Sequence, residues 1–129
     1  MPSSTLNLPA SAFDGDGKFI RQNRTENIYG HVCIRMMLLT LESAPSEHVI
    51  TFTLSERSIP KIEWSVIEDA IKRWCIDNVK IIGGWRINFE VFDGSWQAGA
   101  ISAHDRAARH ALNDATKKAI RAGVLPDPA

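Results

Sequence analysis

The order of apolar and polar residues along the chain predicts four β-strands. A strand is predicted over residues 17–23, and a polar turn separates it from a second, nearly all-apolar strand over residues 28–41. Residues 49–54 alternate β-branched and aromatic side chains, which is typical of a strand. Residues 85–92 place Ile, Phe and Val at every second position and so predict the fourth strand.

Two segments instead repeat their apolar residues at helical spacing. The first is predicted over residues 59–77, with Ser58 as its N-cap and Pro60 in its first turn. Its core-facing positions are expected to be Ile59, Ile62, Val66, Ile67, Ala70, Ile71 and Trp74. The second is predicted over about residues 102–121, and small residues, mostly alanines, form its packing face. Such residues allow a helix to lie close against its neighbour.

The predicted order is therefore β-β-β-α-β-α, an α+β fold with two helices against one face of a four-stranded sheet. A chain of 129 residues suits one domain. Residues 1–16 have no periodic pattern, so we expect a flexible N-terminal tail, then a domain over residues 17–122 and a C-terminal tail over residues 123–129.

Basic residues are in excess in the second predicted helix. Fifteen basic residues balance fifteen acidic ones over the chain, so any RNA binding must rest on a local patch. The second predicted helix carries five basic residues against two acidic ones, and four of its side chains share an outer arc: Arg106, His110, Lys117 and Arg121. The ordinary interpretation is a solvated helix face. An RNA-facing surface that includes Arg21 and Arg24 is the alternative.

The sequence contains no pattern typical of a disulfide scaffold, a metal site, a nucleotide site, a catalytic site or a membrane span. Cys33 and Cys75 have no paired spacing and predict reduced thiols, as in a cytoplasmic protein. The four histidines lack metal-ligand spacing, and neither a phosphate-binding loop nor a nucleophile motif occurs, so we expect no metal, no cofactor, no nucleotide and no enzyme activity. No stretch approaches the ~20 apolar residues of a membrane span, and the N-terminus lacks the pattern of a secretion signal.

Three motifs follow one another in a recognisable order. Residues 17–22 read G-K-F-I-R-Q and residues 29–32 read Y-G-H-V, residues 59–61 read I-P-K, and residues 92–96 read F-D-G-S-W. Together they resemble domain IV of translation elongation factor G. The resemblance fades beyond Gln97.

The resemblance implies a fold like the second domain of ribosomal protein S five, with a left-handed crossover between parallel strands. In that family the domain reaches the decoding centre, and two loops at its tip touch messenger and transfer RNA. Partners would then be the ribosome or a structured RNA. With the basic helix added, the expected RNA-binding residues are Arg21, Arg24, Asn27, Trp96, Gln97, Arg106 and Lys117.

The predicted tip departs from the family pattern. Residues 23–28 read N-R-T-E-N-I where the family has S-G-G-R-G-Q, so Glu26 stands in place of an arginine, and Gln97 replaces a histidine. A carboxylate repels phosphate. Two hypotheses follow: a ribosome- or RNA-associated module with a diverged tip, or a protein-interaction domain, which could form a homodimer through a Trp-rich or Ala-rich face.

We predict that Glu26→Arg strengthens RNA binding by about 1 kcal/mol at low salt, since it relieves one repulsion and adds one phosphate contact. A filter-binding titration against a short structured RNA at two salt concentrations measures this. Tight, salt-insensitive binding by the unmodified chain would contradict the idea of a diverged tip.

Overall fold

The computed structural model describes residues 9–22, 27–40, 48–83, 85–95 and 101–127. The strands are β1 (Pro9–Gln22), β2 (Asn27–Thr40), β3 (Val49–Phe52) and β4 (Trp85–Ser95). The helices are α1 (Trp64–Asp77), the short α2 (Val79–Ile82) and α3 (Ile101–Arg121), and a 3-10 turn, η2 (Lys61–Glu63), precedes α1.

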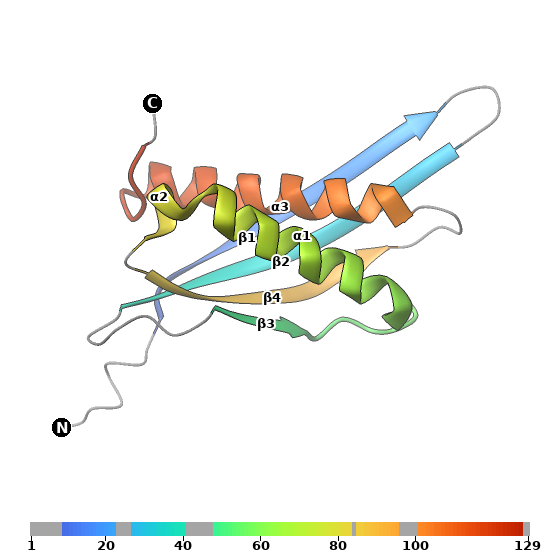
Figure 1. The fold of residues 1–129 in the computed structure, drawn as a ribbon, viewed down its shortest axis with the longest axis horizontal. Helices are drawn as coiled ribbons and strands as arrows, with labels where there is room; N and C mark the ends of the chain where they lie inside the picture. The colour runs from blue at the N-terminus through green and yellow to red at the C-terminus, as the bar shows by residue number, and fades with distance from the viewer. Residues whose placement is uncertain (1–8, 23–26, 41–47, 84, 96–100, 128–129) are drawn as a thin grey trace.

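The strands form one sheet in the order β1-β2-β4-β3. β1 with β2 and β2 with β4 are antiparallel, whereas β3 and β4 are parallel and are connected through α1. α1 and α3 lie side by side on one face of the sheet (Figure 1). The predicted two-layer α+β fold is therefore confirmed. The left hand of the crossover stays a prediction.

The core lies between the sheet and the two long helices. Along β2 the fully buried side chains of Val32, Ile34, Met36 and Leu38 alternate with partly exposed ones. β4 contributes Ile87, Phe89 and Val91, and the helices contribute Ile67, Ile71, Trp74 and Leu112 among others. This period-2 burial is what one covered sheet face requires.

In the middle of β1, two glycines rather than large side chains contact α3. A Cβ atom added to Gly15 would collide with the carbonyl oxygen of Ala111, and one added to Gly17 would collide with that of Ala107. On β2, a Cβ on Gly30 would lie 2.7–2.8 Å from three atoms of Ala103. The helix backbone therefore rests directly on the strand backbones. This confirms that the small residues of α3 serve close packing.

The three sequence motifs meet in space. In β4, Gly94 pairs with Val32 of β2, and a Cβ at Gly94 would lie 2.5 Å from the His31 carbonyl oxygen and 2.6 Å from Cδ1 of Ile59. Ile59 is fully buried, and its carbonyl accepts a hydrogen bond of 2.9 Å from Nε1 of Trp64. The motifs thus fix where the hairpin, the start of the helical segment and the end of β4 join.

The predicted N-terminal tail is wrong for residues 9–16. They belong to β1 and pair with β2, with Asp16 opposite Cys33. Glycine, aspartate and, to a lesser degree, alanine are depleted in strands, so the local sequence did not indicate a strand here. The strand forms because β2 provides backbone hydrogen-bond partners along this length. Its glycines also leave room for the backbone of α3.

Three smaller expectations are also corrected. Ile62 is 80% exposed, because it lies in η2 rather than on the core side of α1. Ser58 precedes η2 and does not cap it; the capping position is Pro60, without a side-chain hydrogen bond. The predicted C-terminal tail is wrong at Leu125, whose side chain is buried. Gly123 has a φ of 78°, and after it the Val124 amide donates a hydrogen bond to the Ala119 carbonyl, so the chain turns back onto the core.

We predict that Gly17→Ala lowers the free energy of unfolding by about 1–3 kcal/mol, the range for overfilling a tight contact. Urea unfolding followed by circular dichroism measures the loss. Lys18→Ala is the control, because Lys18 is the exposed neighbour on the same strand, and it should change stability by less than about 0.5 kcal/mol. Equal effects of the two substitutions would contradict the close contact.

Truncating the core face of α1 gives a second prediction. Ile67→Ala and Ile71→Ala should each cost about 2–4 kcal/mol, because both side chains are fully buried. Ile76→Ala, which removes the same atoms from a side chain that is 73% exposed, should cost less than about 1 kcal/mol. The three variants are compared by urea unfolding.

Candidate nucleic-acid interface

The predicted RNA-binding residues divide into three groups in the structure. Arg24, Trp96 and Gln97 lie outside the described residues. Arg21 and Asn27 lie in the paired ends of β1 and β2, where Arg21 is opposite Ile28 and Asn27 is opposite Gln22. Arg106 and Lys117 both lie exposed on α3. The structure therefore describes the helical part of the predicted interface in side-chain detail.

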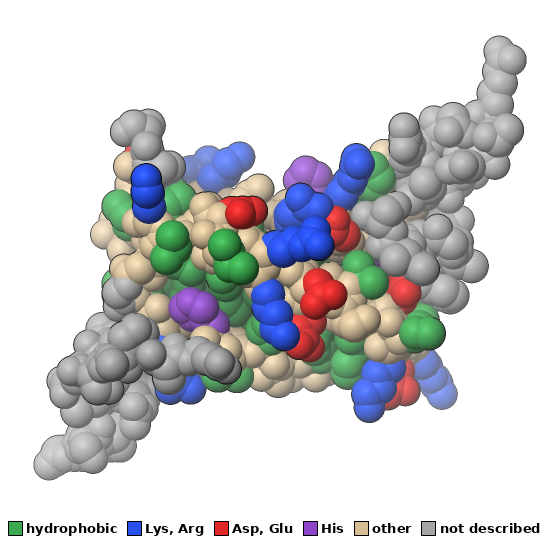
Figure 2. Space-filling view, viewed as in Figure 1, with side chains coloured by type: hydrophobic (Ala, Val, Ile, Leu, Met, Phe, Trp, Pro, Cys, Tyr) green, Lys and Arg blue, Asp and Glu red, His purple; other side chains and the backbone are tan. Residues whose placement is uncertain are grey.

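The outer arc of α3 forms a basic stripe, which we define as Arg106, His110, Lys117 and Arg121. All four side chains are exposed, and their spacing of four, seven and four residues keeps them on one side of the helix. The buried alanines of α3 occupy the opposite side. Lys and Arg side chains gather over the helical face, with acidic side chains beside them (Figure 2).

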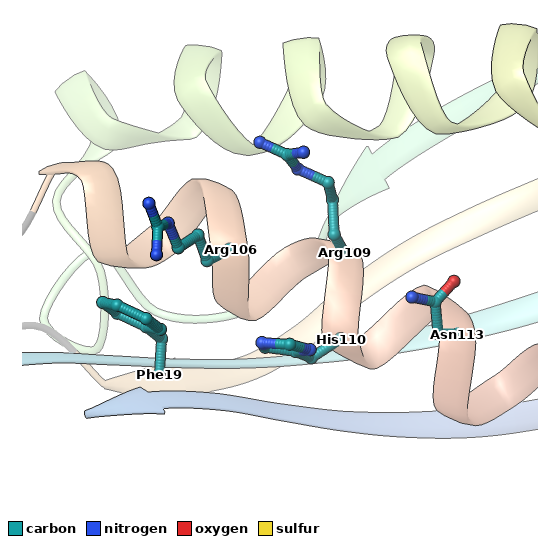
Figure 3. A pocket seen from close by; sticks show the side chains of 5 residues that line it. All are labelled: Phe19, Arg106, Arg109, His110 and Asn113. Atoms are coloured by element: carbon teal, nitrogen blue, oxygen red, sulfur yellow. The ribbon is translucent and has the colours of Figure 1, made fainter. Parts of the chain in front are cut away.

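A hollow of about 420 Å³ lies beside the N-terminal end of this stripe, between α3 and β1. Its lining consists of Phe19 from β1 and of Arg106, Arg109, His110 and Asn113 from α3 (Figure 3). The guanidinium carbon of Arg106 lies 4.8 Å from the centre of the Phe19 ring, a cation–π arrangement that holds the charge over the hollow. The hollow thus combines positive charge with planar side chains.

Neighbouring groups neutralise some of the basic residues of α3 but not others. Arg109 forms an ion pair with Asp105 one helical turn away. Lys118 bonds to the Asp14 carbonyl at 2.6 Å and pairs with Asp114 at 3.5 Å. Among the described residues, no acidic side chain forms an ion pair with Arg106 or Lys117. Within the described part of the chain, these two cations thus keep their charge without an acidic partner.

Hydrogen bonds hold α3 at Asn113, which lines the hollow, and at His104, near the start of the helix. Asn113 accepts a hydrogen bond of 3.0 Å from Nε1 of Trp74 on α1. At the beginning of α3, His104 is fully buried and its Nε2 donates to the Ser95 carbonyl at 2.9 Å, while its Nδ1 lies 3.7 Å from a Glu63 carboxylate oxygen. His104 is therefore a buried, hydrogen-bonded histidine that anchors the start of α3.

Sequence reasoning missed Phe19 as a partner of Arg106. The signal was present, because a period of two from Gly17 places Phe19 on the side of the sheet that α3 covers. Periodicity alone could not show which helical residue would reach the ring. That depends on the register of α3 over β1.

Residues able to ligate a metal ion lie on the other side of the sheet. One oxygen, nitrogen or sulfur atom from each of Asp16, His31 and Cys33 lies within 4.8 Å of the others. Burial, helped by a hydrogen bond to Asp16 and by nearby carboxylates, raises the pKa of Cys33 to about 12, so the free thiol is protonated. The hydrogen bond with His31 lowers the pKa of Asp16. No sequence pattern predicted this cluster, since its members come from paired strands.

Comparisons with known proteins agree with the motifs. No protein-family model matches the chain. Elongation factor G of Petrotoga mobilis is 36% identical over 120 residues, which cover 89% of this chain and 16% of that protein. The chain resembles domain IV of elongation factor G. It spans about a sixth of that factor's length, so the similarity concerns a single domain and makes this a translation-factor-like domain.

A solved structure supports the fold independently. The protein ttk003000868 of Thermus thermophilus superposes with a TM-score of 0.66 at 21% identity, over 88% of this chain and 17% of that one. At this identity the match concerns the fold alone. Within the described part of the chain, no helix is both long and apolar enough to cross a membrane.

Proposed function

We propose that the chain is a non-enzymatic, cytoplasmic RNA-binding module that associates with the ribosome and contacts RNA through the basic stripe of α3. The observation that carries this proposal is the Phe19–Arg106 pair, with Lys117 farther along the same side of α3. Similarity to elongation factor G supports a translational setting. The predicted tip residues Arg24, Trp96 and Gln97 would extend the same interface.

The location of the stripe suits such a contact. β1 ends and β2 begins at the end of the sheet at which β4 ends and α3 starts (Figure 1). Arg106 lies in the second turn of α3, so the stripe begins near that end and runs away from it along the helix. An RNA that reaches the predicted tip could therefore continue over Arg106 towards Lys117.

The chemistry favours phosphate and an unstacked base. Arg106 can donate to phosphate oxygens through its N–H groups while the plane of its guanidinium lies over the Phe19 ring. His110 adds a second planar group at the hollow, on which a base could stack. Because the chain has no net charge, attraction depends on these few cations and is sensitive to salt. We expect weak binding with limited sequence preference.

A protein-interaction domain is the second candidate, and burial limits the surfaces through which it could bind a partner. The alanine-rich face is unavailable, since Ala107, Ala111 and Ala115 are fully buried against the sheet. Trp74 is buried as well, and Trp64 stacks on Phe52. What favours this candidate is the exposure of Ile76 and Val79, at 73% and 60%, near the junction of α1 and α2.

We predict that the double variant Arg106→Gln/Lys117→Gln weakens binding to a short RNA hairpin by about tenfold at low salt and reduces the slope of log K against log salt by roughly 1–2. Arg73→Gln/Lys80→Gln is the matched control: it removes one Arg and one Lys that are exposed on α1 and α2 instead. Filter binding at four salt concentrations measures both quantities.

Equal weakening by the two double variants would show that only total charge matters and would overturn the role of the stripe. If the unmodified chain binds neither the hairpin nor purified ribosomes, the RNA proposal is wrong. Sedimentation velocity of the chain and of Ile76→Ser then tests the second candidate, because an interface at this patch predicts self-association that the substitution removes.

A further inference from the structure

The helix-free face of the sheet carries a mixed cluster of potential metal ligands. In the register of β1 and β2, Asp16 lies opposite Cys33 and Lys18 lies opposite His31. His31 and Cys33 are two residues apart on β2 and so point to the same side of the sheet. β1 and β2 together therefore place a carboxylate, an imidazole and a thiol on one small area of surface.

The atoms of the cluster already approach one another closely. Nε2 of His31 lies 2.5 Å from Oδ1 of Asp16, and Sγ of Cys33 lies 3.3 Å from the same oxygen and 3.5 Å from the same nitrogen. A tetrahedral zinc ion would hold sulfur about 3.6 Å from nitrogen or oxygen, and nitrogen about 3.4 Å from oxygen. Both sulfur distances fit, and the carboxylate would need to move from the ring by only about 1 Å.

The strands hold this arrangement in place. Thirteen residue pairs join β1 to β2 without a break in register around Asp16. On the far side of β2, Cys33 pairs with Asp93 of β4, next to a register shift between Cys33 and Ile34. Gly15 and Gly17, on either side of Asp16, are fixed against α3. The three ligands thus project from a backbone that is ordered before any ion arrives, which lowers the cost of binding.

The charges around the cluster favour a cation. Four carboxylates and two cationic side chains lie on the same face or beside it: Asp14, Asp16, Asp93 and Glu90, with Lys18 and Arg35. Arg35 is bound to Asp14 at 2.7 Å and to Glu90 at 3.4 Å, so it compensates those two acids. Asp16 and Asp93 remain as the negative groups nearest the thiol.

We propose that Asp16, His31 and Cys33 form a binding site for Zn²⁺ on the open face of the sheet. A set of one sulfur, one nitrogen and one oxygen ligand suits zinc, whereas Mg²⁺ requires oxygen ligands in octahedral geometry. Asp16 is 57% exposed in its side chain and His31 20%. A water molecule or a ligand group can therefore complete the tetrahedron from the solvent side.

The test is calorimetric titration of the reduced, chelator-treated full chain with zinc chloride. We expect one Zn²⁺ per chain, an increase in Tm with zinc, and no response to the same concentration of Mg²⁺. Cys33→Ser and His31→Gln should each weaken the apparent affinity by about 100-fold or more, since loss of even an outer partner costs about 10–100-fold.

Matched controls use the same side-chain types elsewhere. Cys75→Ser removes the other cysteine, which is half-buried on α1, and His110→Gln removes an exposed histidine of α3. Both variants should bind zinc like the unmodified chain. Circular dichroism in the presence of a chelator checks that each variant is folded, and Cys33→Ala replaces Cys33→Ser if the latter is not.

Absorption spectra of the Co²⁺-substituted chain report which side chains bind the ion. Co²⁺ in the site should show a thiolate-to-metal charge-transfer band and the intense visible bands of a tetrahedral ion, and Cys33→Ser should abolish the former. The proposal is overturned if the unmodified chain gives neither heat nor a Tm shift with zinc. It is also overturned if binding survives Cys33→Ser and His31→Gln, or is lost in Cys75→Ser or His110→Gln.

Discussion

The contact between the glycines of β1 and β2 and the alanines of α3 is the constraint on which the rest of the structure depends. It lets two backbones touch along Gly15, Gly17 and Gly30 with no side chain between them. Dispersion attraction is greatest where atoms are this close, and any added methyl group would push the helix away. The angle at which α3 displays its polar side follows from this contact.

Both surfaces discussed above derive their geometry from β1. Its residues alternate, so Gly15, Gly17 and Phe19 face the helix while Asp14, Asp16 and Lys18 face the other side. Phe19 supports Arg106 on one face, and Asp16 meets His31 on the other. One strand thus connects a basic helical surface with a cluster of metal-ligand type.

The sequence predicted well those elements whose burial follows a single period. β2, β4 and the core face of α1 are examples, since their apolar positions repeat every two residues or at helical spacing. The first half of β1 escaped prediction because Gly, Ala and Asp carry no such pattern, and its strand conformation depends on partners distant in sequence. The contact of Phe19 with Arg106 and the cluster around Cys33 escaped for the same reason, because both require the register between elements. Motif resemblance predicts where the tip lies, and its residues Arg24, Trp96 and Gln97 lie outside the described residues.

The direct backbone contact of α3 with Gly15 and Gly17 of β1 also limits how the helix can move. If α3 slid along the strand by one residue, or rolled by a fraction of a turn, larger side chains such as Leu112 or Asn113 would replace alanine above the glycines. The helix therefore fits on the sheet in one position only. The backbone positions of Arg106 and Lys117, about 16.5 Å apart along the helix axis at 1.5 Å per residue, keep a constant separation and direction, so a partner meets two cationic side chains attached at fixed points.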